Sequence, residues 1–307
     1  MADRTLLLFK LQRIFHAASG NHVQRLIFRP VHYVAGLVFS RIIFPIVKKR
    51  WEVRTKTFFG ANMNLALPAG LDLYILGAKG HHSECKLAMF LVKNLKPGNN
   101  FYDIGAHVGY FSLLASHLIG EEGQVVGFEA SPDTFELLHK NCYPYQNIHI
   151  ENKAVGKDAE QITFYEFPVL YSEYNSLEKK QYEDREWIKK NQAKEVSIPS
   201  VSLDFYIEEN RIIPDMIKID VEGGEYTVLQ HSAKVLEKYS PVVIMEFIPP
   251  KDGNWENNPH FKAVLWMLEK GYNMHKIDET GEIIPITAEK SVLGIMDSEN
   301  LVFTKSN

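Results

Sequence analysis

The stretch Asn100-Phe-Tyr-Asp-Ile-Gly-Ala-His-Val-Gly-Tyr-Phe-Ser-Leu-Leu-Ala115 decides the fold of this chain. It predicts a short buried strand, a glycine-rich turn and the start of an amphipathic helix, which is the arrangement of a nucleotide-binding turn. A dinucleotide turn of the form G-x-G-x-x-G would need glycine at two positions that hold His107 and Tyr110 here. The turn is therefore a poor fit for a pyrophosphate.

The pattern that remains is D-x-G-x-x-x-G, from Asp103 to Gly109, with a carboxylate at the end of the strand. This pattern suits S-adenosylmethionine, because a cofactor with an amino group and a sulfonium needs an acid and a close backbone approach more than an anion site. The alternative is that Asp103 only caps the helix and that the two glycines only form a turn.

A second apolar strand, Gln124 to Phe128, ends in Glu129, twenty-four residues after Gly105. An acid at this place reaches the ribose hydroxyls, because a carboxylate accepts two hydrogen bonds from a vicinal diol. Ser131 is the expected N-cap of the next helix, with Pro132 at its first position. The alternative reading of Glu129 is a solvated residue at a strand end.

The alternation of strands and helices continues and then breaks. A third strand is expected at Asn147–Asn152, followed by Ala154 and Val155 where an adenine ring would lie in a sheet of this kind. The stretch near 168–195 is polar and aromatic without core periodicity. It is either a lid or substrate loop or a surface excursion.

The third acidic strand end is in the segment Asp215-Met-Ile-Lys-Ile-Asp-Val-Glu-Gly-Gly-Glu225. In an open α/β sheet the ligand crevice lies outside the carboxyl ends of the strands, so Asp220 and Glu222 should face the cofactor turn. We expect Asp220 to act as general base or to orient the acceptor, with Glu222 as its partner. Glu84, Glu246 and His107 are the alternative bases.

These motifs, in this order and spacing, resemble the FkbM family of S-adenosylmethionine-dependent methyltransferases over about residues 84 to 248. The resemblance implies a class I methyltransferase fold: α/β, Rossmann-like and doubly wound, with a mostly parallel sheet and helices on both faces. It also implies O-methylation, commonly of sugar hydroxyls in glycans and related natural products. The expected cofactor residues are Glu84, Asp103, Gly105, Ala106, His107, Gly109, Tyr110, Phe111, Glu129, Ala130, Ser131, Ala154, Val155 and Asp220.

Composition limits the remaining possibilities. With 307 residues, 45% of them apolar, the chain is globular, and we divide it into 1–56, 57–96 and a cofactor-binding part at 97–307. Two cysteines give neither a zinc site nor a disulfide framework, which indicates a reducing, cytoplasmic compartment. Neither they nor the adjacent His81 and His82 have metal-ligand spacing, so no metal ion is expected.

Charge sets the first 56 residues apart. They hold eleven Lys and Arg against two acids, whereas the rest of the chain holds 23 against 36. We expect a helical extension that either caps the main domain or anchors it peripherally at the inner face of a membrane. A membrane span is excluded in this interpretation because the longest uncharged run in the first 56 residues, Pro30 to Ser40, has eleven residues. Nucleic acid is excluded because an acidic main domain repels phosphates.

Between the extension and the turn, the chain should form a strand pair from Asn62–Leu67 and Leu71–Leu76, and then a helix capped by Ser83. A strand is also predicted in the segment that begins at Asp215, and a helix from Glu225 to Glu237 follows it.

Three functions compete for the whole chain: an O-methyltransferase acting on a hydroxylated small molecule or glycan, an NAD-linked oxidoreductase, and a non-catalytic glycan-binding protein.

Overall fold

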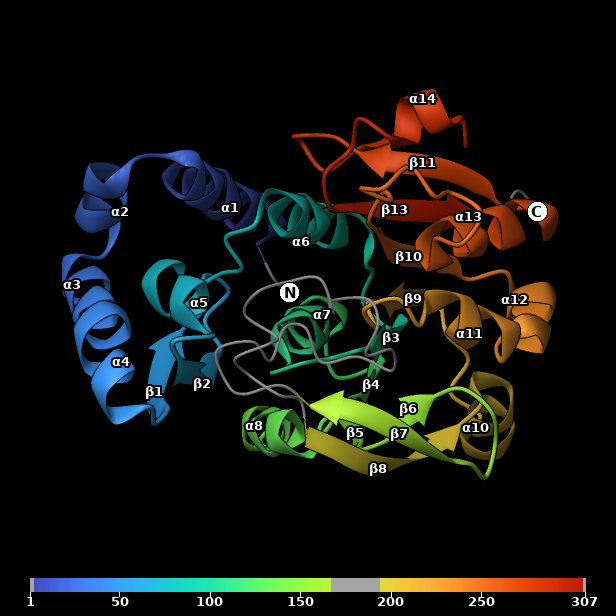
Figure 1. Ribbon diagram of the computed structural model, residues 1–307, viewed down its shortest axis with the longest axis horizontal. Helices are drawn as coiled ribbons and strands as arrows, with labels where there is room; N and C mark the ends of the chain where they lie inside the picture. The colour runs from blue at the N-terminus through green and yellow to red at the C-terminus, as the bar shows by residue number, and fades with distance from the viewer. Residues whose placement is uncertain (1–2, 167–193, 306–307) are drawn as a thin grey trace.

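The computed structural model describes residues 3–166 and 194–305, so most of the expected insertion near 168–195 lies outside the described residues. Its largest sheet has the strand order β12-β11-β13-β10-β9-β3-β4-β5 (Figure 1). Its strands are β3 (Asn100–Ile104), β4 (Gln124–Phe128), β5 (Ile148–Glu151), β9 (Met216–Ile219), β10 (Val242–Phe247), β11 (Asn273–Ile277), β12 (Ile283–Pro285) and β13 (Glu299–Thr304).

The five strands from β5 to β10 run parallel, and β13 lies antiparallel between β10 and β11. From β3 the chain builds outward to β4 and β5 on one side, then returns to lay β9 and β10 on the other. The order therefore reverses between β3 and β9, which is where a doubly wound sheet opens its ligand crevice. The class I methyltransferase fold expected from the sequence is confirmed.

Helices cover both faces of the sheet because alternate strand residues point to opposite sides. Phe101 and Val125 belong to one buried cluster, whereas their neighbours Tyr102 and Val126 belong to a second cluster. The first face carries α6 (His82–Asn94), α7 (Tyr110–Ile119) and α8 (Pro132–Cys142). The second carries α10 (Leu203–Asn210), α11 (Glu225–Gln230), α12 (Ala233–Tyr239) and α13 (Pro259–Glu269), and the short α14 (Lys290–Leu293) lies beyond β12.

Two helices differ from the sequence expectation. The predicted helix 225–237 is two helices, α11 and α12, because the chain turns at His231-Ser232 and the Ser232 hydroxyl donates to the carbonyl of Val228 at 2.6 Å. Ser83 does not cap α6: the N-cap is His81, and Ser83 lies inside the first turn with its hydroxyl 2.8 Å from Nδ1 of His81. The Ser131 cap is confirmed, since its hydroxyl accepts from the Thr134 amide.

The expected strand Leu71–Leu76 is wrong. These residues form helix α5, and β2 (Asn62–Leu67) pairs antiparallel with β1 (Trp51–Lys56) instead. Five of the six α5 residues are apolar without the strict alternation of a half-buried strand, and Gly77 ends the helix at φ 70°. Residues 51–56, which the sequence-based division assigned to the helical extension, thus form a two-stranded sheet with β2.

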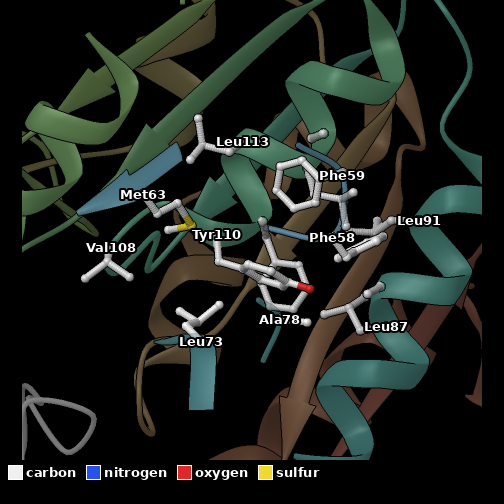
Figure 2. Packing of buried hydrophobic residues seen from close by; sticks show 14 of the residues in the cluster. Phe58, Phe59, Met63, Leu73, Ala78, Leu87, Leu91, Val108, Tyr110 and Leu113 are labelled. Atoms are coloured by element: carbon white, nitrogen blue, oxygen red, sulfur yellow. The ribbon is translucent and has the colours of Figure 1, made fainter. Parts of the chain in front are cut away.

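Residues 58–78 share one core with the sheet. Figure 2 shows Phe59, Met63 and Leu73 packed around Tyr110 of α7, and Leu87 of α6 closing the same cluster. The side chains of Phe59 and Tyr110 have ring centroids 6.0 Å apart. This N-terminal piece is therefore not a separate folding unit.

A third sheet has the order β6-β8-β7, made of β6 (Ala154–Val155), β7 (Gln161–Glu166) and β8 (Lys194–Val201). β8 pairs parallel with β6 and antiparallel with β7, with Glu166 opposite Lys194. The chain therefore leaves β7 and enters β8 at the same end, which is opposite to the end of β8 that pairs with Ala154 and Val155.

The N-terminal extension is α1 (Arg4–Ser19), α2 (His22–Phe28), α3 (Pro30–Val38), the π-helical turn η1 (Phe39–Ile43) and α4 (Phe44–Val47). They form the outer edge of the molecule at the left of Figure 1. The stretch Pro30–Val47 is long and apolar enough to cross a membrane by length and composition. The exclusion of a span was wrong on this point, because it ended the apolar run at Arg41, whereas one charged residue does not end the helix.

Candidate functional site

A cavity of about 370 Å³ lies at the carboxyl ends of the strands, on both sides of the point where the sheet order reverses. Nine of the residues expected at the cofactor site line it: Glu84, Gly105, His107, Phe111, Glu129, Ala130, Ala154, Val155 and Asp220. Five others lie outside its lining: Asp103, Ala106, Gly109, Tyr110 and Ser131. Both proposed catalytic residues, Asp220 and Glu222, are on its wall.

Close packing of the chain accounts for the glycines of the turn. Gly105 has φ 79°, and a Cβ there would lie 1.8 Å from the carbonyl oxygen of Asp220. Gly109 has φ 87°, and a Cβ there would lie 2.8 Å from Leu138 of α8. Gly109 thus allows α7 to pack against α8, whereas Gly105 brings the cofactor turn against the turn that follows β9.

Asp103 faces inward and binds a cation of the protein itself. It is fully buried, accepts a hydrogen bond from the Ser112 hydroxyl at 2.7 Å, and lies 3.3 Å from Nζ of Lys218. Lys218 is buried in the middle of β9 and also lies 3.2 Å from Oδ2 of Asp220. Burial alone would lower the pKa of Lys218, but Asp220 and Asp103 hold this pKa above its usual value. The ammonium group of Lys218 therefore forms ion pairs with the acids at the ends of both β3 and β9.

Glu129 is held by the backbone on both of its oxygens. The amide of His107 donates to Oε2 at 2.8 Å and the amide of Ser131 donates to Oε1 at 2.9 Å. Burial raises the pKa of Glu129 to about 7, although these two amides oppose the rise. Each carboxylate oxygen has a second lone pair, so the group can still accept from a ligand in the cavity.

Three carboxyl groups converge on the other side of the cavity. Atoms of Asp220, Glu222 and Glu246 all lie within 4.8 Å of one another. Asp220 and Glu222 follow β9, and Glu246 lies on the neighbouring strand β10. Glu129, at the end of β4, is three strand spacings from β10, about 14 Å along the sheet edge. Three carboxylate oxygens within this distance of one another could hold one hard cation of the size of Ca²⁺, which binds oxygen at about 2.3–2.6 Å.

The pKa values of two of these acids are driven apart. Burial would raise the pKa of Asp220, but Lys218 and Lys79 bring it below the usual range, so Asp220 is ionised at neutral pH. Burial, together with the charges of Asp220 and Glu222, raises the pKa of Glu246 well above its usual value, so Glu246 keeps its proton to a higher pH than Asp220 does. Neighbouring acids with opposite shifts suit one base and one hydrogen-bond donor.

The side chain of Glu225 holds the turn after β9 through hydrogen bonds to its backbone. Its Oε1 accepts from the amides of Val221 and Gly223 at 3.2 and 3.3 Å, and its Oε2 lies 3.3 Å from Nδ1 of the buried His260. Glu222 has φ 52°, a backbone conformation that is uncommon for a residue with a side chain. Glu225 therefore acts as a positioning residue for Asp220 and Glu222.

The alternative bases differ from Asp220 in their surroundings. Burial and the charge of Lys79 lower the pKa of His107 to about 3, so this imidazole is neutral. Glu84 lies 2.8 Å from Nζ of Lys79 in an ion pair. The pKa of Glu246 is raised, so this carboxyl group holds its proton more strongly than Asp220 does.

A second cavity, also of about 370 Å³, adjoins the first. The two share Lys79, His81, Glu84 and His107 on their walls. The second cavity continues over Leu71 and other residues of the β2–α5 connection and reaches Ser131. The site thus extends past the sheet edge to the N-terminal piece of the molecule.

Sequence reasoning left Lys79, His81 and Lys218 out of the site. The sequence does carry a signal for Lys218, because a lysine in a strand that is otherwise fully apolar needs a buried partner. Lys79 and His81 precede the helix that ends before the cofactor turn; His81 was considered only for metal binding, and Lys79 was not considered. Their place on the cavity wall depends on how α6 packs, which no local pattern indicates.

The family comparison fits this geometry. The methyltransferase FkbM domain matches residues 103–274, which is more than half of the chain. A hexuronic acid methyltransferase, AglP of Haloferax volcanii, is 24% identical over 173 residues. This match covers 55% of the present chain and 65% of the relative, so the chain spans less than two thirds of that protein.

Two solved structures are given as examples of the likeness in fold. Methyltransferase FkbM from Methylobacillus flagellatus is 12% identical with a TM-score of 0.41, covering 76% of this chain and 52% of that one. An O-methyltransferase from Bacillus cereus in complex with SAH is 14% identical with a TM-score of 0.40, covering 72% and 80%. The fold assignment therefore depends on the strand order and on the matched domain, and this chain belongs to the FkbM methyltransferase family.

Proposed function

We propose that the protein transfers the methyl group of S-adenosylmethionine to a hydroxyl group of a sugar or glycan. The observation that carries this proposal is the pair of acids Asp220 and Glu246, which lie close together with pKa values shifted in opposite directions, in the same cavity as the ribose-binding candidate Glu129. The name of the Haloferax relative, a hexuronic acid methyltransferase, supports a sugar as the acceptor class.

The residues on the cavity wall fit this cofactor. Five acids, among them Glu84 and Glu222, face two lysines, Lys79 and Lys153, so the wall favours a cationic ligand. Phe128, Val155 and neighbouring apolar side chains offer a surface for an adenine ring, and the buried Nδ1 of His107 has no hydrogen-bond partner in the described part of the chain. When bound, the cofactor supplies a methyl group on a positively charged sulfur.

The protein's own residues then position the acceptor and take its proton. Methyl transfer needs the acceptor oxygen in line with the breaking carbon–sulfur bond, about 3 Å from the carbon, and this alignment provides much of the rate. As the oxygen–carbon bond forms, the hydroxyl proton passes to the carboxylate of Asp220. In its protonated form, which the raised pKa favours, Glu246 can donate a hydrogen bond to the acceptor, while its Oε1 accepts one from the Ser298 hydroxyl.

Two measurements test the proposal. Isothermal titration with S-adenosylhomocysteine and with NAD separates a methyltransferase from an NAD-linked oxidoreductase. Methyl transfer to methyl glycosides of glucose, glucuronic acid and galacturonic acid then identifies the acceptor, with catechol as a hydroxyl compound that is not a sugar. Binding of S-adenosylhomocysteine without transfer to any saccharide or other hydroxyl compound would favour a non-catalytic glycan-binding protein.

The cofactor half of the site gives a separate prediction. Replacing Glu129→Ala should weaken S-adenosylhomocysteine binding by about 1–3 kcal/mol, the scale of a lost hydrogen bond to a charged group. Because the pKa of Glu129 is raised to about 7, the carboxylate is lost as the pH falls through 7, and wild-type affinity should be lower at pH 6 than at pH 8.

The control for this prediction is the exposed Glu121→Ala, which should bind as the wild type does. Glu129→Gln should bind weakly at both pH values, because an amide has no titrating proton. Unchanged affinity in Glu129→Ala would remove this residue from the cofactor site.

A further inference from the structure

The N-terminal extension has one face packed on the domain and one apolar face without cover in the described structure. α1 is attached firmly: Leu7, Leu11 and Ile14 are buried against α6, and the guanidinium of Arg4 donates to the carbonyls of Val92 and Leu95 near the end of that helix. The extension is therefore a fixed part of the protein surface.

One face of the stretch Pro30–Val47 packs against β1 and α5. Tyr33, Gly36 and Phe39 are buried there. The ring of Phe39 lies 5.2 Å from that of Trp51 in β1, and a Cβ on Gly36 would lie 2.6 Å from Leu71 of α5. These contacts hold the first part of the stretch, through Phe39, against the protein, whereas the part at residues 41–47 is almost entirely exposed.

The outer face of the same helix is aliphatic. Its exposed members recur at helical spacing, and we call them the outer stripe: Val31, Val34, Val38, Ile42 and Ile46. Val31 is 74% exposed and Ile46 is 78% exposed. On α2, Ile27 is also 74% exposed. A continuous exposed patch of this kind marks an interaction surface, because isolated exposed apolar residues do not recur in this way.

Basic residues accompany the outer stripe. Arg41, Lys48 and Lys49 are exposed at its end, and the extension has no acid between Asp3 and Glu52. Arg25 and Arg29 point inward instead, donating to the carbonyls of Ala18 and Lys56. The charge on the apolar side is therefore of one sign.

We propose that the outer stripe docks on the surface of a membrane that contains anionic lipids. Aliphatic side chains enter the boundary between headgroups and acyl chains, and the lysines and Arg41 contact lipid phosphates. A second copy of the chain fits less well, because pairing two such extensions brings two strongly basic segments together. A span fits less well, because lipid all around the helix would require Tyr33 and Phe39 to leave their packing.

Sedimentation of the full chain with vesicles tests this docking. The protein should bind phosphatidylcholine vesicles that contain phosphatidylglycerol, and high salt should weaken this binding. Ile42→Ser/Ile46→Ser and, separately, Arg41→Gln/Lys48→Gln/Lys49→Gln should each lower the partition coefficient by about tenfold or more. The matched control is Ile284→Ser/Ile295→Ser, which removes two exposed isoleucines that are not part of the extension and should bind normally.

Three results would overturn the proposal. The first is a wild-type protein that stays in solution with anionic vesicles. The second is a larger mass in sedimentation equilibrium without lipid that Ile42→Ser/Ile46→Ser abolishes, which assigns the stripe to a second copy. The third is membrane-bound protein in cells that resists both high salt and alkaline carbonate, which assigns a span. Unchanged melting temperature and S-adenosylhomocysteine affinity in the variants show that their fold is intact.

Discussion

Replacing Asp220→Asn should lower turnover by about a hundredfold or more, the usual scale of general-base loss, while leaving cofactor affinity and melting temperature near those of the wild type. The amide keeps the shape of the side chain but cannot accept the acceptor's proton. Since Lys218 and Lys79 hold the pKa of Asp220 below its usual range, the carboxylate stays ionised as the pH falls through the neutral range. Wild-type kcat should accordingly show no loss from this group between pH 8 and pH 6.

The same kinetic assay separates Asp220 from its neighbours. Asp252→Asn, in the loop after β10, is the matched control and should turn over normally. Glu246→Gln imitates the protonated state of Glu246, so it should cost far less than Asp220→Asn. A full rate in Asp220→Asn, or an equal loss in Glu246→Gln, would show that Asp220 is not the base.

Replacing Lys218→Met should lower the free energy of unfolding by about 3–5 kcal/mol, because it leaves the buried carboxylate of Asp103 without its cation. The pKa of Asp220 should rise in the same variant, since Lys218 is the first of the charges that lower it. Urea denaturation measures the first effect, and the pH dependence of kcat measures the second.

An exposed ion pair provides the control for this effect. Lys93→Met breaks the 2.6 Å contact with Glu282 at the surface and should cost less than about 1 kcal/mol. The double variant Asp103→Asn/Lys218→Met removes both buried charges and should recover part of the lost stability. A loss in Lys218→Met as small as that in Lys93→Met would mean that the Lys218 site is solvated.

Local sequence patterns were sufficient for the central sheet. Strands such as Gln124–Phe128 carry their own apolar pattern, and the helix at 132 carries its own cap, so neither depends on distant residues. Leu71–Leu76 shows where this ends. A run of six residues of which five are apolar suits either a buried strand or a buried helix. Only the packing of this segment against α3, β1 and β2 decides between the two.

The candidate site divides in the same way. Glu129 and Asp220 were assigned from strand ends, because the topology of a parallel sheet brings such ends together. The direction of a side chain was not available from the sequence: Asp103 faces Lys218 in the interior instead of the cavity. Tyr110 likewise belongs to the core of Figure 2, because the first turn of α7 directs it toward Phe59.

The contact between Gly105 and the carbonyl of Asp220 also constrains how this protein can change in evolution. Any side chain at position 105 would lie 1.8 Å from that oxygen, so a substitution there becomes acceptable only after the turn behind β9 has moved. Conversely, an insertion in that turn would leave a gap beneath the glycine. The two positions should therefore drift together among homologues, as one inherited unit, even though 115 residues of sequence separate them.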